Sequence, residues 1–117
     1  MTLQGNSKLL RIFIGESDKI GHNLLYEKIL IVAREKGLAG GTVLKGITSY
    51  GADTHIHRAR LIELSEDLPV IIEIVDTGEK IDKFLPVVND LFERCGRGGL
   101  ITIEKVDVLY YQPKTRK

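Results

Sequence analysis

The alternation of apolar and polar residues predicts two buried strands, residues 8–14 and residues 70–75. Both segments are short, nearly continuous apolar runs rich in isoleucine, leucine and valine, which is typical of strands in a core. Apolar residues occupy both faces of residues 8–14. Such a strand is usually central, or another subunit covers its second face.

Two longer segments repeat their apolar residues with the period of a helix. In the first, residues 23–36, we expect Asn23 to cap the start and Gly37 to follow the end in a left-handed conformation. The expected buried stripe of this helix consists of Leu25, Ile29, Val32 and Ala33.

The second helix begins at Asp76 or Thr77, either of which can cap it, and ends at Cys95. Pro86 lies inside it and lacks the amide that a helix interior needs, so we expect a kink there. The stripe of this helix is the clearest in the chain. Its members are Ile81, Phe84, Leu85, Val88, Leu91 and Phe92.

The remaining segments predict strands joined by polar turns. We interpret residues 42–50 and 58–64 as the two arms of a projecting β-ribbon, with a polar loop at residues 52–57. Residues 100–111 predict a last strand. Its apolar residues change parity near residues 104–105, which indicates a bulge or bend. Residues 112–117 are expected to form a polar tail.

These elements predict one α+β domain spanning residues 1–117. Without the extra ribbon their order is βαββαβ, the split βαβ arrangement of ferredoxin-like folds, here a sandwich of two helices on an antiparallel sheet. The second sheet face then carries many apolar side chains. Because exposed apolar faces of that size mark interfaces, we expect an oligomer.

Composition narrows the possible functions. The formal net charge of the 117 residues is +1, so no strong field favours nucleic acid as a partner. No apolar run approaches the ~20 residues of a membrane span, and no signal pattern opens the chain. With a single cysteine, a cytoplasmic location is the simplest expectation. No acid/base pair or nucleophile motif predicts an enzyme.

Three motifs resemble those of the PII signal-transduction proteins: GGTVLKG at residues 40–46, VIIEIV at 70–75 and CGRGGLITI at 95–103. The run EKIDKFLPVVNDLFERCGRGGLITIEKVDV resembles more closely the uncharacterised family of small PII-like proteins of bacteria and archaea. The resemblance implies a homotrimer of ferredoxin-like subunits. It also implies an adenine nucleotide (AMP, ADP or ATP, with or without magnesium) in the clefts between subunits, and a loop that signals to a protein partner.

The resemblance also implies a site. Thr42 and Val75 match positions beside the adenine, and the Lys-Gly-Ile turn after Thr42 matches the base of the signalling loop. The Gly-Arg-Gly-Gly turn matches the phosphate side, where backbone amides can form a nest and Arg97 a charged clamp. The implied nucleotide-binding residues are Thr42, Lys45, Gly46, Ile47, Val75, Gly96, Arg97, Gly98 and Gly99.

The sequence also departs from the PII pattern. Its loop is shorter than that of PII proteins, and Leu100 stands near the place of the PII lysine. The arginine pair that closes the PII site falls on Tyr110 and Gln112. From the residues alone, a tight helix-to-strand connection that requires positive φ angles is the simpler interpretation of the glycine turn, and the family resemblance favours the phosphate site.

A second function stays open on the sequence. A trimeric metal-binding or structural protein, resembling the divalent-cation tolerance proteins, would have the same fold. His55 and His57 could place two imidazoles on one side of the ribbon, but two ligands fall short of the four of a structural zinc site. Tyr50, near the base of the loop, resembles the tyrosine that some PII proteins have modified, and it also fits a packing role in the ribbon.

Overall fold

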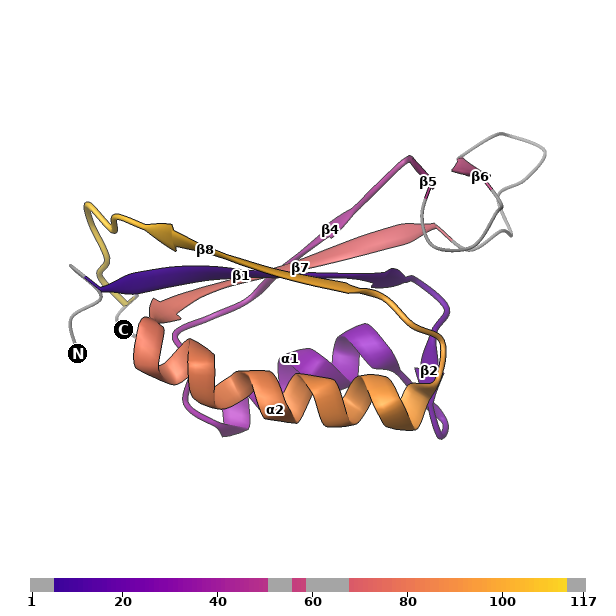
Figure 1. The fold of residues 1–117 in the computed structure, drawn as a ribbon, viewed down its shortest axis with the longest axis horizontal. Coiled ribbons are helices and arrows are strands. Elements are labelled where there is room, and N and C mark those ends of the chain that lie inside the picture. The colour runs from indigo at the N-terminus through magenta and orange to yellow at the C-terminus, as the bar shows by residue number, and fades with distance from the viewer. Residues whose placement is uncertain (1–5, 51–55, 59–67, 114–117) are drawn as a thin grey trace, which may run out of the picture.

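A computed structural model describes residues 6–50, 56–58 and 68–113. Its main sheet is antiparallel, with strands in the order β4-β7-β1-β8. The first helix, α1, follows β1, and the second, α2, follows β7, which confirms the expected βαββαβ order (Figure 1). The elements are β1 (Ser7–Gly15), α1 (Leu25–Glu35), β4 (Thr42–Lys45), β7 (Pro69–Thr77), α2 (Gly78–Cys95) and β8 (Leu100–Val106).

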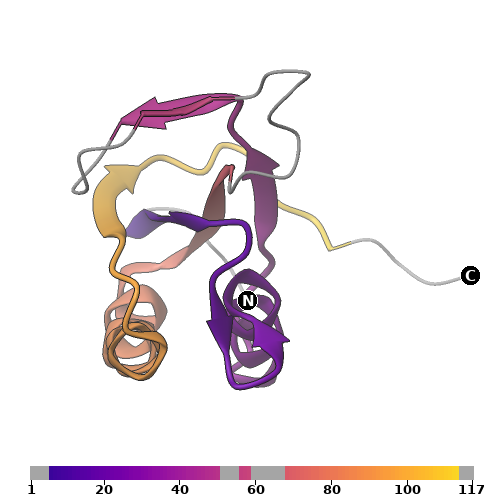
Figure 2. The same cartoon turned by 90° about the vertical axis from the view of Figure 1, so that its right-hand side faces the viewer.

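Both helices cover the same face of the sheet, and the core lies between them and the two central strands (Figures 1 and 2). Along β7, and along β1 from Leu10 to Ile14, every second residue is buried, as the alternation of a strand requires. The stripes predicted for the helices face this core; Val32, Leu85 and Phe92 are only partly buried at its edge. The buried helix residues include Leu25, Ile29, Ala33, Ile81, Phe84, Val88 and Leu91.

The expected cap of α1 is wrong. Asn23 belongs to a small hairpin in which β2 (Lys19–Ile20) pairs with β3 (Asn23–Leu24). Leu24 occupies the N-cap position and makes no side-chain capping bond. The backbone N–H of Leu25 donates instead to the carbonyl oxygen of Asp18, at 2.7 Å. The hairpin therefore satisfies a helix amide that we assigned to an Asn side chain.

The ends of α2 agree with the sequence. The Thr77 hydroxyl accepts a hydrogen bond from the Lys80 N–H, and Gly96 ends the helix in a left-handed conformation with φ of 75°. The helix runs uninterrupted through Pro86, which lies on its exposed side. Gly37 follows α1 with φ of 81°, as expected.

The predicted ribbon arms are partly wrong. Residues Thr42–Lys45 form the edge strand β4 and pair with β7, so they belong to the main sheet. The ribbon itself pairs β5 (Thr48–Tyr50) with β6 (Ile56–Arg58), and Figure 1 shows it beyond one end of that sheet. The ribbon separates from the main sheet at Gly46, whose N–H donates to the Pro69 carbonyl oxygen at 2.8 Å. Residues 59–64 of the predicted second arm lie outside the described part of the chain.

The last strand is shorter than expected and has no bulge. β8 pairs with β1 in an unbroken register, from Leu100 opposite Phe13 to Val106 opposite Ser7. Residues 107–113 have no regular structure and cross the sheet face opposite the helices (Figure 2). The change of apolar parity therefore marks the end of the strand, after which side chains no longer alternate between faces.

Asp76 provides a test of this fold because it is fully buried in the described structure. Its carboxylate accepts hydrogen bonds from the backbone N–H of Ala39, at 2.8 Å, and of Thr77, at 2.6 Å. Asp76→Ala should lower the free energy of unfolding by about 1–3 kcal/mol, since it leaves buried amides without acceptors. Urea denaturation measures the change. The control Asp90→Ala removes an exposed carboxylate paired with Arg94 and should cost less than about 0.5 kcal/mol. Equal losses in the two variants would contradict the assigned role of Asp76.

Candidate functional site

A groove of about 500 Å³ lies on the sheet face opposite the helices. The strands β1, β4 and β7 provide one side, and the segment after β8 provides the other. Its volume is within the range of about 300–1,000 Å³ that is usual for small-molecule sites. It is lined by Leu9, Ala39, Gly40, Gly41, Thr42, Glu73, Val75, Val108, Tyr110 and Tyr111.

The strand register brings two predicted site residues together in this groove. Thr42 lies directly opposite Glu73 across the β4–β7 ladder, so their side chains are neighbours on one face. Val75 is two residues further along β7 and therefore on the same face, opposite Leu9 of β1. Thr42 and Val75, which the sequence resemblance placed beside an adenine, thus line a single groove.

The charged groups beside the groove form one network. The Arg11 Nε donates to Glu73 Oε2 at 2.9 Å, and Arg11 Nη1 donates to Glu104 Oε1 at 2.5 Å. The hydrogen bond to Glu73 raises the pKa of the Arg11 guanidinium; desolvation opposes this shift and Glu104 adds to it. Arg11 therefore stays cationic while it bridges two carboxylates. Among the described residues, no lysine, arginine or histidine lines the groove itself.

Gly41 lets the chain run close to the core beside the groove. A Cβ atom on Gly41 would lie 2.8 Å from Leu30 Cδ2 and 3.4 Å from Ile74 Cγ1. A Cβ on the adjacent Gly40 would meet nothing within 4 Å. Of this glycine pair, Gly41 is therefore the one at which a larger residue would displace a neighbouring side chain, that of Leu30.

The predicted loop-base residues lie beyond the groove, toward the far end of β4. Lys45 ends β4 and pairs with Glu16, with Nζ 2.7 Å from Oε2. Gly46 is held to Pro69, and Ile47 is 75% exposed. These residues stand where the ribbon leaves the sheet, as the sequence placed them, but they do not line the groove with Thr42 and Val75.

The Gly-Arg-Gly-Gly turn lies at the opposite edge of the sheet. It joins α2 to β8, whereas Thr42 is on the other edge strand, β4. Gly96 and Gly98 have positive φ angles, and a Cβ on Gly99 would lie 2.8 Å from the Phe13 carbonyl oxygen. Backbone geometry and close packing are therefore sufficient to explain the glycines of this turn. Arg97 is exposed and makes no hydrogen bond or ion pair with any other residue in the described ranges.

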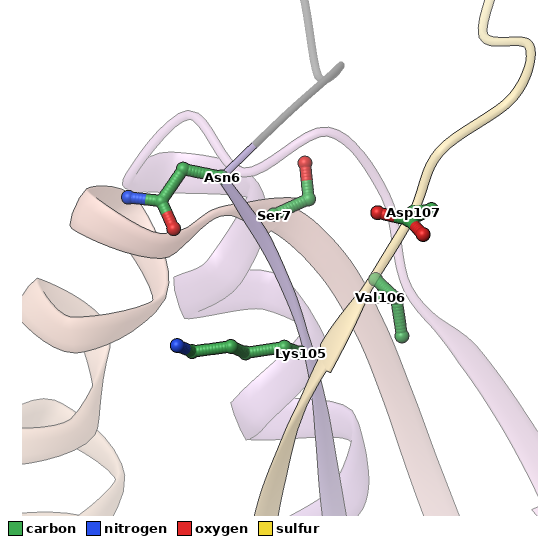
Figure 3. A pocket seen from close by; sticks show the side chains of 5 residues that line it. All are labelled: Asn6, Ser7, Lys105, Val106 and Asp107. Atoms are coloured by element: carbon green, nitrogen blue, oxygen red, sulfur yellow. The ribbon is translucent and has the colours of Figure 1, made fainter.

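A second, smaller pocket of about 200 Å³ lies where β1 begins and β8 ends (Figure 3). Asn6, Ser7, Lys105, Val106 and Asp107 line it, and the sequence did not indicate it. Figure 3 shows the Lys105 side chain directed away from Ser7 and Asp107. Because its cationic and anionic groups do not converge on one point, this pocket is a weaker candidate than the groove.

Sequence reasoning missed several groove residues, notably Glu73, Tyr110 and Tyr111. Glu73 was visible as the only polar residue of its apolar run, which is a signal that could have been followed. The tyrosines were assigned to a strand. Their place in the groove depends on the path of the chain after Val106, which no local pattern shows.

Comparison with known proteins places this fold in a family. The family model DUF190, described as an uncharacterized ACR of group COG1993, matches residues 7–108. A UPF0166 protein of Aquifex aeolicus is 40% identical over 103 residues, covering 88% of this chain and 93% of that protein. UPF0166 protein MJ1524 of Methanocaldococcus jannaschii is 39% identical over 97 residues, covering 83% and 86%. The chain belongs to this family, which has members in bacteria and archaea.

Solved structures show that the fold is PII-like. CPII of Thiomonas intermedia K12, bound to ADP and bicarbonate, has a TM-score of 0.66 at 18% identity and 87% coverage of both chains. The same protein, described as a nitrogen regulatory PII-like protein and bound to ADP, AMP and bicarbonate, has a TM-score of 0.64 at 15% identity, covering 91% and 96%. The divalent cation tolerance protein CutA of Archaeoglobus fulgidus has a TM-score of 0.51 at 14% identity, covering 91% and 87%.

Among the described residues, neither α1 nor α2 has the length and hydrophobicity of a membrane-spanning helix. The same residues contain no group of three or more histidine, cysteine, aspartate or glutamate side chains that could hold a metal ion. His55 and the side chain of His57 lie outside this description, so the predicted histidine pair stays a prediction.

The glycine turn gives a prediction about stability. Gly99→Ala should lower the free energy of unfolding by about 1–3 kcal/mol, because the new Cβ would overlap the Phe13 carbonyl oxygen and the Phe92 ring. The control Gly40→Ala, which meets no atom, should change it by less than about 0.5 kcal/mol. Thermal and urea unfolding of both variants measure the difference. A stable Gly99→Ala protein would show that this turn has more room than its geometry indicates.

Proposed function

We propose that the protein is a PII-like regulatory protein, not an enzyme, that binds an adenine nucleotide between the subunits of a homotrimer. The observation that carries the proposal is the groove in which Thr42 and Val75 meet. The CPII structures, whose ligands include ADP and AMP, share the fold and support the choice of ligand class.

The chemistry of the groove suits the base of a nucleotide. Apolar side chains, including Leu9 and Val75, provide surface for a flat ring, and Tyr110 and Tyr111 add aromatic surface for stacking. Thr42 and Glu73 supply polar groups that can fix its orientation. Phosphates do not suit the groove, because no cationic residue in the described ranges lines it.

The phosphates therefore need a second surface, for which we propose the Gly96–Gly99 turn of a neighbouring subunit. This turn and the groove lie at opposite edges of one subunit's sheet, so one chain alone does not join them. Arg97 is exposed and makes no ion pair with another described residue, which leaves its guanidinium available for a charge-assisted contact. Calorimetry with and without magnesium tests whether the ion accompanies the phosphates.

Signalling would use the ribbon and its loop. Ile47 is 75% exposed where the β5–β6 ribbon leaves the sheet, so an apolar side chain is available to a protein partner there. In this proposal, nucleotide at the groove changes the position of β4, and β4 continues into the ribbon. The CutA-like alternative shares the fold, but no observation in the described residues favours metal binding.

The sheet face opposite the helices supports an oligomer, and the resemblance to PII proteins supplies the number three. That face carries apolar side chains from four strands, including Leu44 and Leu100, which are 45% and 55% exposed. Packing of three such faces would remove this surface from water. Sedimentation equilibrium should therefore give three times the 13.1 kDa chain mass. A stable monomer at micromolar concentration would contradict the assembly and the inter-subunit site.

Titration calorimetry with AMP, ADP and ATP, with and without magnesium, tests the proposed function. We expect Arg97→Ala to weaken ADP and ATP binding about tenfold to a hundredfold, because a hydrogen bond to a charged group is typically worth about 1.5–3 kcal/mol. Arg94→Ala is the matched control: it removes an exposed arginine of α2 that pairs with Asp90, outside the turn. If both variants bind ADP and ATP as the parent does, the phosphate assignment is wrong.

A further inference from the structure

Among the described residues, Glu73 carries the one carboxylate that lines the groove. We propose that it makes the groove select adenine over 6-oxopurines, by accepting a hydrogen bond from the exocyclic amino group of the base. This inference rests on the nucleotide-binding function proposed above. It adds the residue that distinguishes one base from another.

The hydrogen bond between Arg11 and Glu73 leaves the second carboxylate oxygen of Glu73 fully open to a ligand. Oε2 accepts from Arg11 Nε at 2.9 Å, and Oε1 has no hydrogen-bond partner among the described residues. The side chain is 31% exposed and lies across the ladder from Thr42. A ligand in the groove therefore meets a carboxylate oxygen beside a hydroxyl group.

The charge of the network strengthens this acceptor. Glu73 and Glu104 share one guanidinium, that of Arg11, so the three side chains keep a net negative charge. An ionised carboxylate accepts hydrogen bonds and donates none. The groove thus favours a donor on the ligand at this point and disfavours an acceptor.

Adenine and the 6-oxopurines differ in the hydrogen-bonding group at position 6. Adenine carries an amino donor at position 6, whereas guanine and hypoxanthine carry an oxygen acceptor there. In the proposed pose the amino group donates to Glu73 Oε1 and the Thr42 hydroxyl donates to ring N1. A 6-oxo group in that pose would place an acceptor against the carboxylate.

The contact with Arg11 also limits recognition of guanine by its other edge. The adjacent N1–H and N2–H donors of guanine suit a carboxylate that offers both oxygens. Here Arg11 Nε already donates to Oε2, so a two-donor contact of guanine would have to share that oxygen with Arg11. Arg11 is thus a positioning residue: it holds Glu73 in an orientation that leaves Oε1 fully open to the ligand.

Calorimetry on the intact protein tests this selection. The parent should bind ADP at least about tenfold more tightly than inosine diphosphate or guanosine diphosphate, the effect of one charge-assisted hydrogen bond. Glu73→Gln has the same shape and can donate to a 6-oxo group, so it should bring the ADP and inosine diphosphate affinities within about threefold. Glu104→Gln is the matched control, since it loses a carboxylate paired with the same Arg11 outside the groove lining; because Glu73 remains in place, this variant should still prefer ADP over inosine diphosphate.

Three other results would each contradict the selection of adenine by Glu73. If the parent binds ADP and inosine diphosphate equally, Glu73 does not select the base, although the nucleotide-binding function stands. If Glu73→Gln keeps the preference, or Glu104→Gln loses it equally, the selection does not come from the Glu73 acceptor. If the parent binds no nucleotide, the proposed function fails and this inference fails with it. The comparison of ligands on the parent needs no variant, so it holds even if Glu73→Gln does not fold.

Discussion

The pairing register of β1 with β7 is the constraint on which the rest of the structure depends. The two strands pair without interruption from Ser7 opposite Thr77 to Gly15 opposite Pro69. Because side chains alternate between the faces of a strand, this register assigns every residue of both strands to the helix side or to the open side. A slip of one residue would move Arg11 into the core, where its charge would lose water and lack both carboxylates.

The same register builds the groove. It places Leu9 opposite Val75 and Arg11 opposite Glu73 on the open face. The edge strand β4 then adds Thr42 opposite Glu73. Sheet pairing thus positions Thr42 and Glu73, so these polar groups of the groove lie on rigid elements. The C-terminal segment completes it with side chains that no ladder positions.

The glycines of this protein meet two different structural needs, close packing and positive φ angles. Gly41 and Gly99 allow close packing against side-chain or backbone atoms, whereas Gly96 and Gly98 supply positive φ angles. These needs are structural, so a glycine-rich motif by itself does not identify a phosphate site. What distinguishes the α2–β8 turn is the exposed Arg97 within it, and only an assembly of subunits could bring that residue near a groove.

The sequence by itself determined the elements whose signal is local: two strands, two amphipathic helices, the stop at Gly96 and the βαββαβ order. Their periodicity follows from the geometry of strand and helix, so a single chain shows it. Tertiary structure decided what depends on partners distant in sequence. Asn23 lost its capping role because a hairpin satisfied the helix amide, and residues 42–45 joined β7 instead of the ribbon because β7 offered them a ladder. Tyr110 and Tyr111 reach the groove because the chain leaves the sheet after Val106, where its pairing with β1 ends. No local pattern in the sequence shows where that pairing ends.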